Sequence, residues 1–117
     1  MRAVLNFDGS GNGSGGYVIH AEDRTLSAGF DFGSVTSNQA EYYALICGLK
    51  RLAHEFDPAE IDLVVRGDSK LVVNQVAGKW RIKERYLLAP ALECRKLLGQ
   101  FRSHVLEWVP RRRNREA

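Results

Sequence analysis

The chain has 117 residues, 44% of them hydrophobic and 26% charged, as is usual for one globular domain with an apolar core. No apolar run is long enough to span a membrane, so a membrane protein is not expected. The formal net charge is only +3, but basic residues gather at positions 79–85 and 111–115. Such clusters favour a polyanionic partner, with ordinary solvated surface charge as the alternative.

The two cysteines, Cys47 and Cys94, fall in helical patterns without metal-ligand spacing. The N-terminus passes directly into a strand pattern, so a secretion signal is not expected. We therefore expect residues 1–117 to form one cytoplasmic domain with reduced thiols.

Three strands joined by short turns are predicted at the start of the chain. Residues 3–8 alternate between two faces and deliver Asp8 to a glycine-rich turn. Residues 16–21 and 25–32 are the second and third strands. Their short connections favour an antiparallel meander.

Two further strands and three helices are predicted for the rest of the chain. In order, they are a helix capped near Ser37 or Asn38, a strand at 61–66, a helix after Asp68, a helix with Pro90 in its first turn, and a strand at 104–109. This order predicts an α/β fold, a mixed sheet with helices on both faces.

Three acidic residues, Asp8, Glu41 and Asp68, lie where a charge is unfavourable unless it is paired. Each has a local explanation. Asp8 can prepare a turn at the next residue, Glu41 can belong to a capping box with Ser37, and Asp68 can cap a helix. None of these local roles explains the other two acids.

A shared metal site explains all three acids together. Three carboxylates about 5 Å apart repel one another by about 3 kcal/mol per pair at an effective dielectric constant near 20. Cations remove that repulsion, and ligand sets made only of oxygen favour Mg²⁺ or Mn²⁺ over zinc. The sequence therefore predicts a site for one of these two metals.

The chain also resembles ribonuclease HI along its whole length, most closely the compact archaeal-type and short bacterial forms. The motifs that carry the resemblance are Asp8-Gly9-Ser10 with Gly11-Asn12-Gly13, Asn38-Gln39-Ala40-Glu41, Gly67-Asp68-Ser69 and Trp108-Val109-Pro110. The resemblance implies a monomer with a five-stranded mixed sheet, its first three strands antiparallel. It also implies endonucleolytic cleavage of the RNA strand in RNA/DNA hybrids with two divalent ions.

The resemblance implies roles for individual residues. Asp8 is expected to bridge both metal ions, and Glu41 and Asp68 to hold the ion on the leaving-group side. The expected substrate contacts are Gly11, Asn12, Asn38 and Gln39 at RNA 2′-hydroxyls, Thr36 and Asn38 at DNA phosphates, and Lys70, Lys79, Trp80 and Arg81 elsewhere on the hybrid. Trp80 is expected to pack on the DNA strand, and a half-buried core tryptophan is the alternative.

The sequence departs from the family at its end. In the family an Asp follows the Asn-x-Glu-Ala motif, which here forms the last four residues, beginning at Asn114. The family's flexible histidine is replaced by the arginines at 111–113. We therefore expect the last family helix to be absent, Val105 and Trp108 to be partly exposed, self-association to be favoured, and cleavage to be slow.

Three other functions remain open from the sequence. The first two are a resolvase or 3′-exonuclease of the same fold, and an inactive domain that only binds nucleic acid. The third is nucleotide binding, because Gly11, Gly13 and Gly16 match the spacing of a dinucleotide fingerprint. A strand is predicted where that fingerprint needs a helix, which argues against the third.

Overall fold

The computed structural model describes residues 1–114. Its strands are β1 (Arg2–Gly9), β2 (Ser14–Ala21), β3 (Arg24–Asp31), β4 (Asp62–Gly67) and β5 (Ser103–Trp108). Its helices are α1 (Ser37–Glu55), α2 (Lys70–Val76) and α3 (Arg85–Leu98), with short 3₁₀ turns η1 (Pro58–Glu60) and η2 (Arg111–Arg113). Within this part of the chain, no helix combines the length and apolar character needed to cross a membrane.

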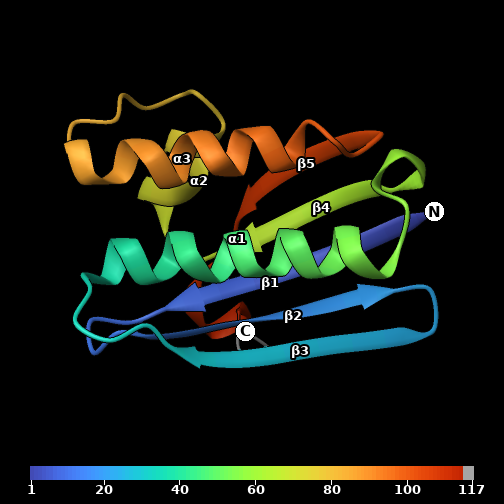
Figure 1. Cartoon of the computed structure of the whole chain (residues 1–117), viewed down its shortest axis with the longest axis horizontal. Coiled ribbons are helices and arrows are strands. Elements are labelled where there is room, and N and C mark those ends of the chain that lie inside the picture. Colours follow the sequence, from blue (N-terminus) through green and yellow to red (C-terminus); the bar gives the residue numbers. More distant parts are fainter. Residues whose placement is uncertain (115–117) are drawn as a thin grey trace.

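The five strands form one sheet in the order β3-β2-β1-β4-β5 (Figure 1). β2 runs antiparallel to both of its neighbours, β1 and β3, whereas β4 runs parallel to β1, and β5 runs parallel to β4. The predicted five-stranded mixed sheet is therefore confirmed. The C-terminal ends of β1 and β4 lie at the same edge, where an α/β fold builds its sites.

The α-helices of the described residues share one face of the sheet, so the expectation of helices on both faces is wrong for residues 1–114. α1 lies over β1 and β2, and α3 packs beside α1 (Figure 1). Ala3, Leu5 and Phe7 of β1 are fully buried on this face. The opposite face carries an ion pair between Arg66 and Glu107, with a nitrogen–oxygen distance of 3.1 Å. A polar surface of this kind has little apolar area to hide under a helix.

The N-termini of α1 and α2 are capped by residues other than those predicted. Thr36 caps α1 in a capping box with Gln39, and Ser69 caps α2 through a hydrogen bond from the Val72 N–H. Hydroxyl side chains therefore satisfy the first N–H groups of both helices. Glu41 and Asp68 are not needed as caps, which removes their local explanations.

Helix α3 begins at Arg85, so the placement of Pro90 in its first turn is wrong. Leu87 is fully buried and already belongs to the apolar side of the helix that includes Ala91 and Cys94. Burial of a leucine contributes about 2 kcal/mol, which favours starting the helix before the proline. Pro90 is itself buried.

The chain after β5 forms the turn η2, and no α-helix follows β5 within residues 1–114. Val105 is 55% exposed and Trp108 is 43% exposed, which confirms the expected exposure at this place. The other expectations about the final motif concern residues 115–117, which lie outside the described residues.

Candidate metal centre and substrate grooves

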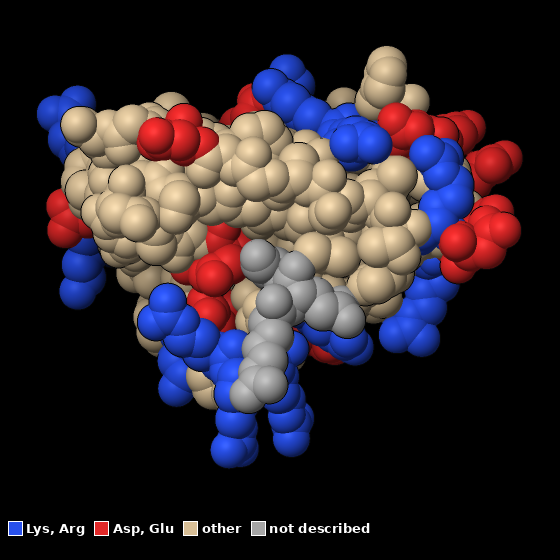
Figure 2. Space-filling model, turned by 90° about the horizontal axis from the view of Figure 1, so that it is seen from below, with Lys and Arg blue, Asp and Glu red and all other residues tan. Residues whose placement is uncertain are grey.

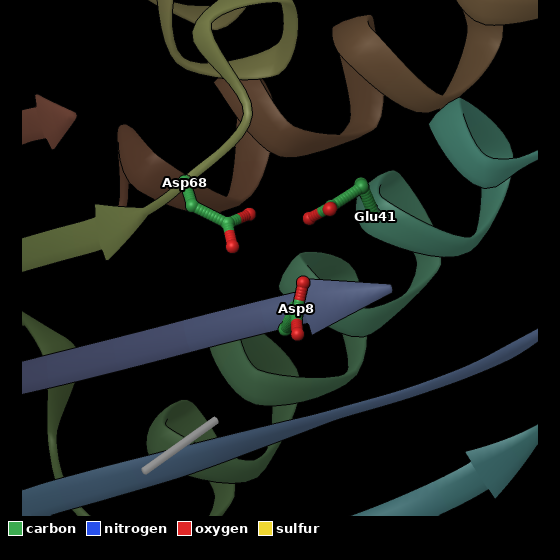
Figure 3. A group of neighbouring side chains, drawn as sticks. All are labelled: Asp8, Glu41 and Asp68. Carbon is green, nitrogen blue, oxygen red and sulfur yellow. The ribbon is translucent and has the colours of Figure 1, made fainter. Parts of the chain in front are cut away.

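The three predicted acids converge at one edge of the sheet. Asp8 stands at the end of β1, Glu41 on the second turn of α1, and Asp68 directly after β4. Figure 3 shows their carboxylates directed toward one another. One oxygen of each carboxylate lies within 4.8 Å of the others, close enough to share metal ions.

Two glycines let the acid-bearing segments approach this closely. A Cβ atom at Gly9 would lie 2.5 Å from backbone atoms of Ala40 and Glu41, so only a glycine lets β1 meet the start of α1. A Cβ atom at Gly67 would lie 2.5 Å from the ring of Phe7. The glycine after Asp8 and the glycine before the third acid therefore serve the geometry of the site.

The electrostatics of the site favour a cation. Burial, followed by the charges of Asp8 and Asp68, raises the pKa of Glu41 to about 9. Glu41 is 6% exposed, and its Oε2 atom has no hydrogen-bond partner among the described residues. Burial and the charge of Asp8 also raise the pKa of Asp68, while Arg111 opposes this shift. A buried carboxylate oxygen without a partner, in an all-oxygen cluster, fits a hard divalent ion such as Mg²⁺ or Mn²⁺.

The acids lie in a cleft of about 310 Å³. Besides the acids, its lining comprises Gly9, Ser10, Gly11, Ser37, Ser69 and Arg111. In the view of Figure 2, acidic side chains lie in a recess beside a group of basic side chains. The cleft therefore combines metal-binding oxygens with hydroxyl groups and a guanidinium.

Comparison with known proteins places this site in a family. A family model described as reverse transcriptase-like matches residues 3–117. The N-terminal RNase H domain of Rv2228c from Mycobacterium tuberculosis is 34% identical, with a TM-score of 0.91 over 100% of this chain and 93% of that one. RNase H1 from Halobacterium salinarum is also 34% identical, with a TM-score of 0.83 over 99% of this chain and 89% of that one. The chain belongs to the ribonuclease H1 family.

The curated relatives in this family are longer than the chain. It aligns with 33% of the bifunctional protein Rv2228c of M. tuberculosis, at 37% identity over 97% of its own length. It aligns with 60% of ribonuclease HI of H. salinarum, at 36% identity over 99% of its own length. LC11-RNase H1, solved in complex with an RNA/DNA hybrid, is 28% identical, with a TM-score of 0.83 over 99% of this chain and 89% of that one.

The predicted 2′-hydroxyl contacts of this ribonuclease H1 domain flank the acidic cleft. Gly11 and Asn12 are exposed in the β1–β2 turn, and Gly11 lines the cleft. The Asn12 side chain closes its own turn by accepting a hydrogen bond from the Ser14 N–H at 3.0 Å. Asn38 and Gln39 lie in the first turn of α1, directly after the cap Thr36.

Most of the other predicted contacts gather in a second groove. Its lining brings together Asn38, Leu71, Gln75, Lys79, Trp80, Arg81, Lys83 and Glu84. Trp80 is 46% exposed and is not among the described residues that form the apolar core or pack against it, which argues against the half-buried core tryptophan of the alternative interpretation. Lys70 is not among the residues that line this groove, and its Nζ atom lies 4.6 Å from the centre of the Trp108 ring.

Two residues near the acids were not singled out from the sequence. Arg111 lines the acidic cleft, but the sequence does not distinguish it from the neighbouring arginines. Asn114 is 3% exposed and donates a hydrogen bond from Nδ2 to the carbonyl of Phe7 at 2.8 Å. Both positions depend on how the chain returns to β1 after β5.

Proposed function

We propose that this chain is a metal-dependent endonuclease that cleaves the RNA strand of RNA/DNA hybrids. The observation that carries the proposal is the convergence of Asp8, Glu41 and Asp68 in a cleft of a ribonuclease H1 domain. A relative of the same fold, LC11-RNase H1, has been solved with an RNA/DNA hybrid, which supports this substrate.

The three carboxylates would hold Mg²⁺ or Mn²⁺, two ions when substrate is bound, with Asp8 shared between them. When bound, such ions activate water and stabilise the departing oxygen of a phosphodiester. The Oε2 atom of Glu41, which has no hydrogen-bond partner within residues 1–114, and the raised pKa of this residue, about 9, support its role as a ligand. The acids supply the negative charge that selects cations. Gly9 and Gly67 allow the segments that carry these acids to lie close together.

The acidic cleft and the second groove, which we call the basic groove, lie on either side of the start of α1. This arrangement matches a duplex with two different strands. Ser37 and Glu41, one helical turn apart, face the acidic cleft. Asn38 faces the groove that contains Lys79 and Trp80. The RNA strand would lie in the acidic cleft, and the DNA strand would lie in the basic groove, where an aromatic ring can pack on it.

Discrimination of RNA from DNA would depend on polar groups at the rim of the acidic cleft, near Gly11 and Ser37 of its lining. The exposed turn at Gly11 and Asn12 and the first turn of α1 at Asn38 and Gln39 present backbone and amide groups there. Such groups can hydrogen-bond to the 2′-hydroxyl, the group that distinguishes the two nucleic acids.

One assay tests the proposal against its alternatives. The chain is incubated with a hybrid labelled in the RNA strand, with Mg²⁺, with Mn²⁺ or with a chelator. A four-way DNA junction, duplex DNA and single strands serve as comparison substrates. Internal cleavage of the RNA strand that requires metal supports the proposal. Junction cleavage or stepwise removal of terminal nucleotides identifies another nuclease of this fold, and binding without cleavage with either metal identifies a binding module.

A further inference from the structure

The segment 108–114 returns from β5 across the edge of the sheet that carries the acids, and we name it the C-terminal strap. Its first end is fixed to the backbone around Asp68. The Trp108 Nε1–H donates to the Asp68 carbonyl at 3.0 Å, and the Val109 N–H donates to the Gly67 carbonyl at 2.9 Å. This end of the strap is therefore tied to the strand end that presents the third acid.

The second end of the strap is fixed beside Asp8. The Nδ2 atom of Asn114 donates to the carbonyl of Phe7, the residue directly before this acid, at 2.8 Å. Phe7 and Gly67 are partners in the parallel pairing of β1 and β4. The strap thus bridges the two strand ends, and the buried Nδ2 group of Asn114 has its hydrogen-bond acceptor at this place.

Between these anchors the strap presents Arg111 to the acidic cleft. Among the described residues that line the cleft, Arg111 is the sole cation. Its Nε atom lies 3.9 Å from Asp68 Oδ2, and its side chain is 81% exposed. An ion pair this long and this exposed contributes little by itself, so the anchored backbone rather than the pair keeps the guanidinium here.

We infer that Arg111 binds an RNA-strand phosphate next to the metal site, and that Asn114 is the positioning residue that holds it there. The inference rests on the proposed function. Three carboxylates alone repel a polyanion, and a guanidinium offers a planar set of donors that matches phosphate oxygens. The exposed side of Arg111 is free to receive such a phosphate while the strap fixes its backbone.

The first test measures hybrid binding in the Asp8→Asn background, which prevents cleavage during the measurement. Arg111→Ala is expected to weaken binding roughly 5- to 30-fold and to reduce the slope of log affinity against log salt by about one. Arg112→Ala is the matched control, because it removes the same charge from the same strap without lining the cleft. The control is expected to change the affinity less than about two-fold.

The second test releases the strap at either anchor. Asn114→Ala and Trp108→Phe each remove one hydrogen bond to the acid-bearing strand ends. Each is expected to weaken hybrid binding, as Arg111→Ala does. When combined with Arg111→Ala, each is expected to lower the hybrid affinity further by less than about two-fold. Thermal unfolding of each variant identifies global destabilisation. If Asn114→Ala does not fold, Asn114→Ser, which keeps a small polar side chain at this position, takes its place in the test.

A third measurement separates a phosphate contact from a simple counter-ion. Mn²⁺ binding to the free protein, followed by calorimetry, is expected to change less than about two-fold in Arg111→Ala, because the long, exposed pair with Asp68 is screened by solvent. Tighter Mn²⁺ binding with unchanged hybrid affinity would make Arg111 a counter-ion of Asp68 and overturn the inference. Additive effects of the strap anchors and Arg111→Ala would overturn the positioning role of Asn114. A parent chain that neither binds nor cleaves hybrids contradicts the proposed function itself.

Discussion

The acidic cleft and the basic groove lie on two sides of one helix start, yet they are constructed differently. The cleft draws Asp8, Glu41 and Asp68 from three separate elements and brings their oxygens within 4.8 Å of one another. The groove takes most of its charge from the single segment around Lys79 and Arg81, whose side chains are exposed.

This difference indicates which part of the molecule tolerates change. In the cleft, glycine contacts and buried charges fix positions, because a shift of the backbone would separate the ligands or bring atoms into collision. In the groove, exposed charges act on a polyanion through screened, roughly additive attraction. Substitutions of the acids in the cleft should therefore alter chemistry, whereas substitutions in the groove should alter affinity.

The largest expected effect is the loss of catalysis in Asp8→Asn. This acid is expected to contact both metal ions, so cleavage of a hybrid should fall roughly 10³-fold or more. The fold should persist, because the change removes one of three repelling charges without changing side-chain volume. Single-turnover cleavage and thermal unfolding measure the two quantities. Asp23→Asn, at the exposed β2–β3 turn, is the control, and full activity in Asp8→Asn would rule out the metal site.

Glu41→Gln tests how ionisation of the Glu41 carboxyl affects the stability of the metal-free chain. The pKa of Glu41 is about 9 in the folded chain against 4.5 for an unperturbed carboxyl, so the folded state holds an extra proton between these values. The free energy of unfolding should therefore fall as pH rises through this window. At pH 8, Glu41→Gln should stabilise the metal-free chain by about 1–3 kcal/mol.

Denaturant unfolding at pH 5 and pH 8, with a chelator and then with Mg²⁺, measures this linkage. The stabilising effect of Glu41→Gln should be smaller at pH 5, because pH 5 lies close to the unperturbed pKa of 4.5 and the unfolded carboxyl still holds part of its proton there. With Mg²⁺ it should disappear or change sign, because the ion then stabilises the parent chain. An equal effect at both pH values would mean that the Glu41 carboxyl does not titrate as described.

The sequence predicts the local features of both sites better than their long-range contacts. Alternation of apolar residues identifies the strands, and the position of Asp68 at a strand end identifies a site, because both signals are local. The cap at Thr36 and the start of α3 before Pro90 depend on packing, which outweighs local preference. Asn114 meets Phe7 across 107 positions, and no periodicity reports such a contact.

Trp80→Ala addresses the groove and should have a smaller effect than either change in the cleft. Loss of an aromatic ring that packs on nucleic acid weakens binding by about 1–2 kcal/mol, or roughly 5- to 30-fold. KM for the hybrid should rise while kcat stays within about two-fold, because the ring is remote from the acids. Tyr86→Ala is the control, since Tyr86 is 45% exposed but does not line the groove. An equal loss in both variants would assign no special role to Trp80.

The smallest expected effect is that of Lys79→Ala, and it is best detected in the salt dependence of hybrid binding. Lys79 lines the groove and is exposed, so it would contact one phosphate as a point charge in high-dielectric surroundings. At about 0.1 M salt the affinity should fall only about two- to three-fold, but the slope of log affinity against log salt should decrease by about one. Lys96→Ala removes the same charge from an exposed position on α3 and should leave that slope unchanged. A salt titration of hybrid binding over about 0.05–0.3 M therefore separates phosphate contact from general net charge. Equal slopes for the parent chain and both variants would show that Lys79 does not neutralise a phosphate, and that the groove binds through Trp80 and its neighbours instead.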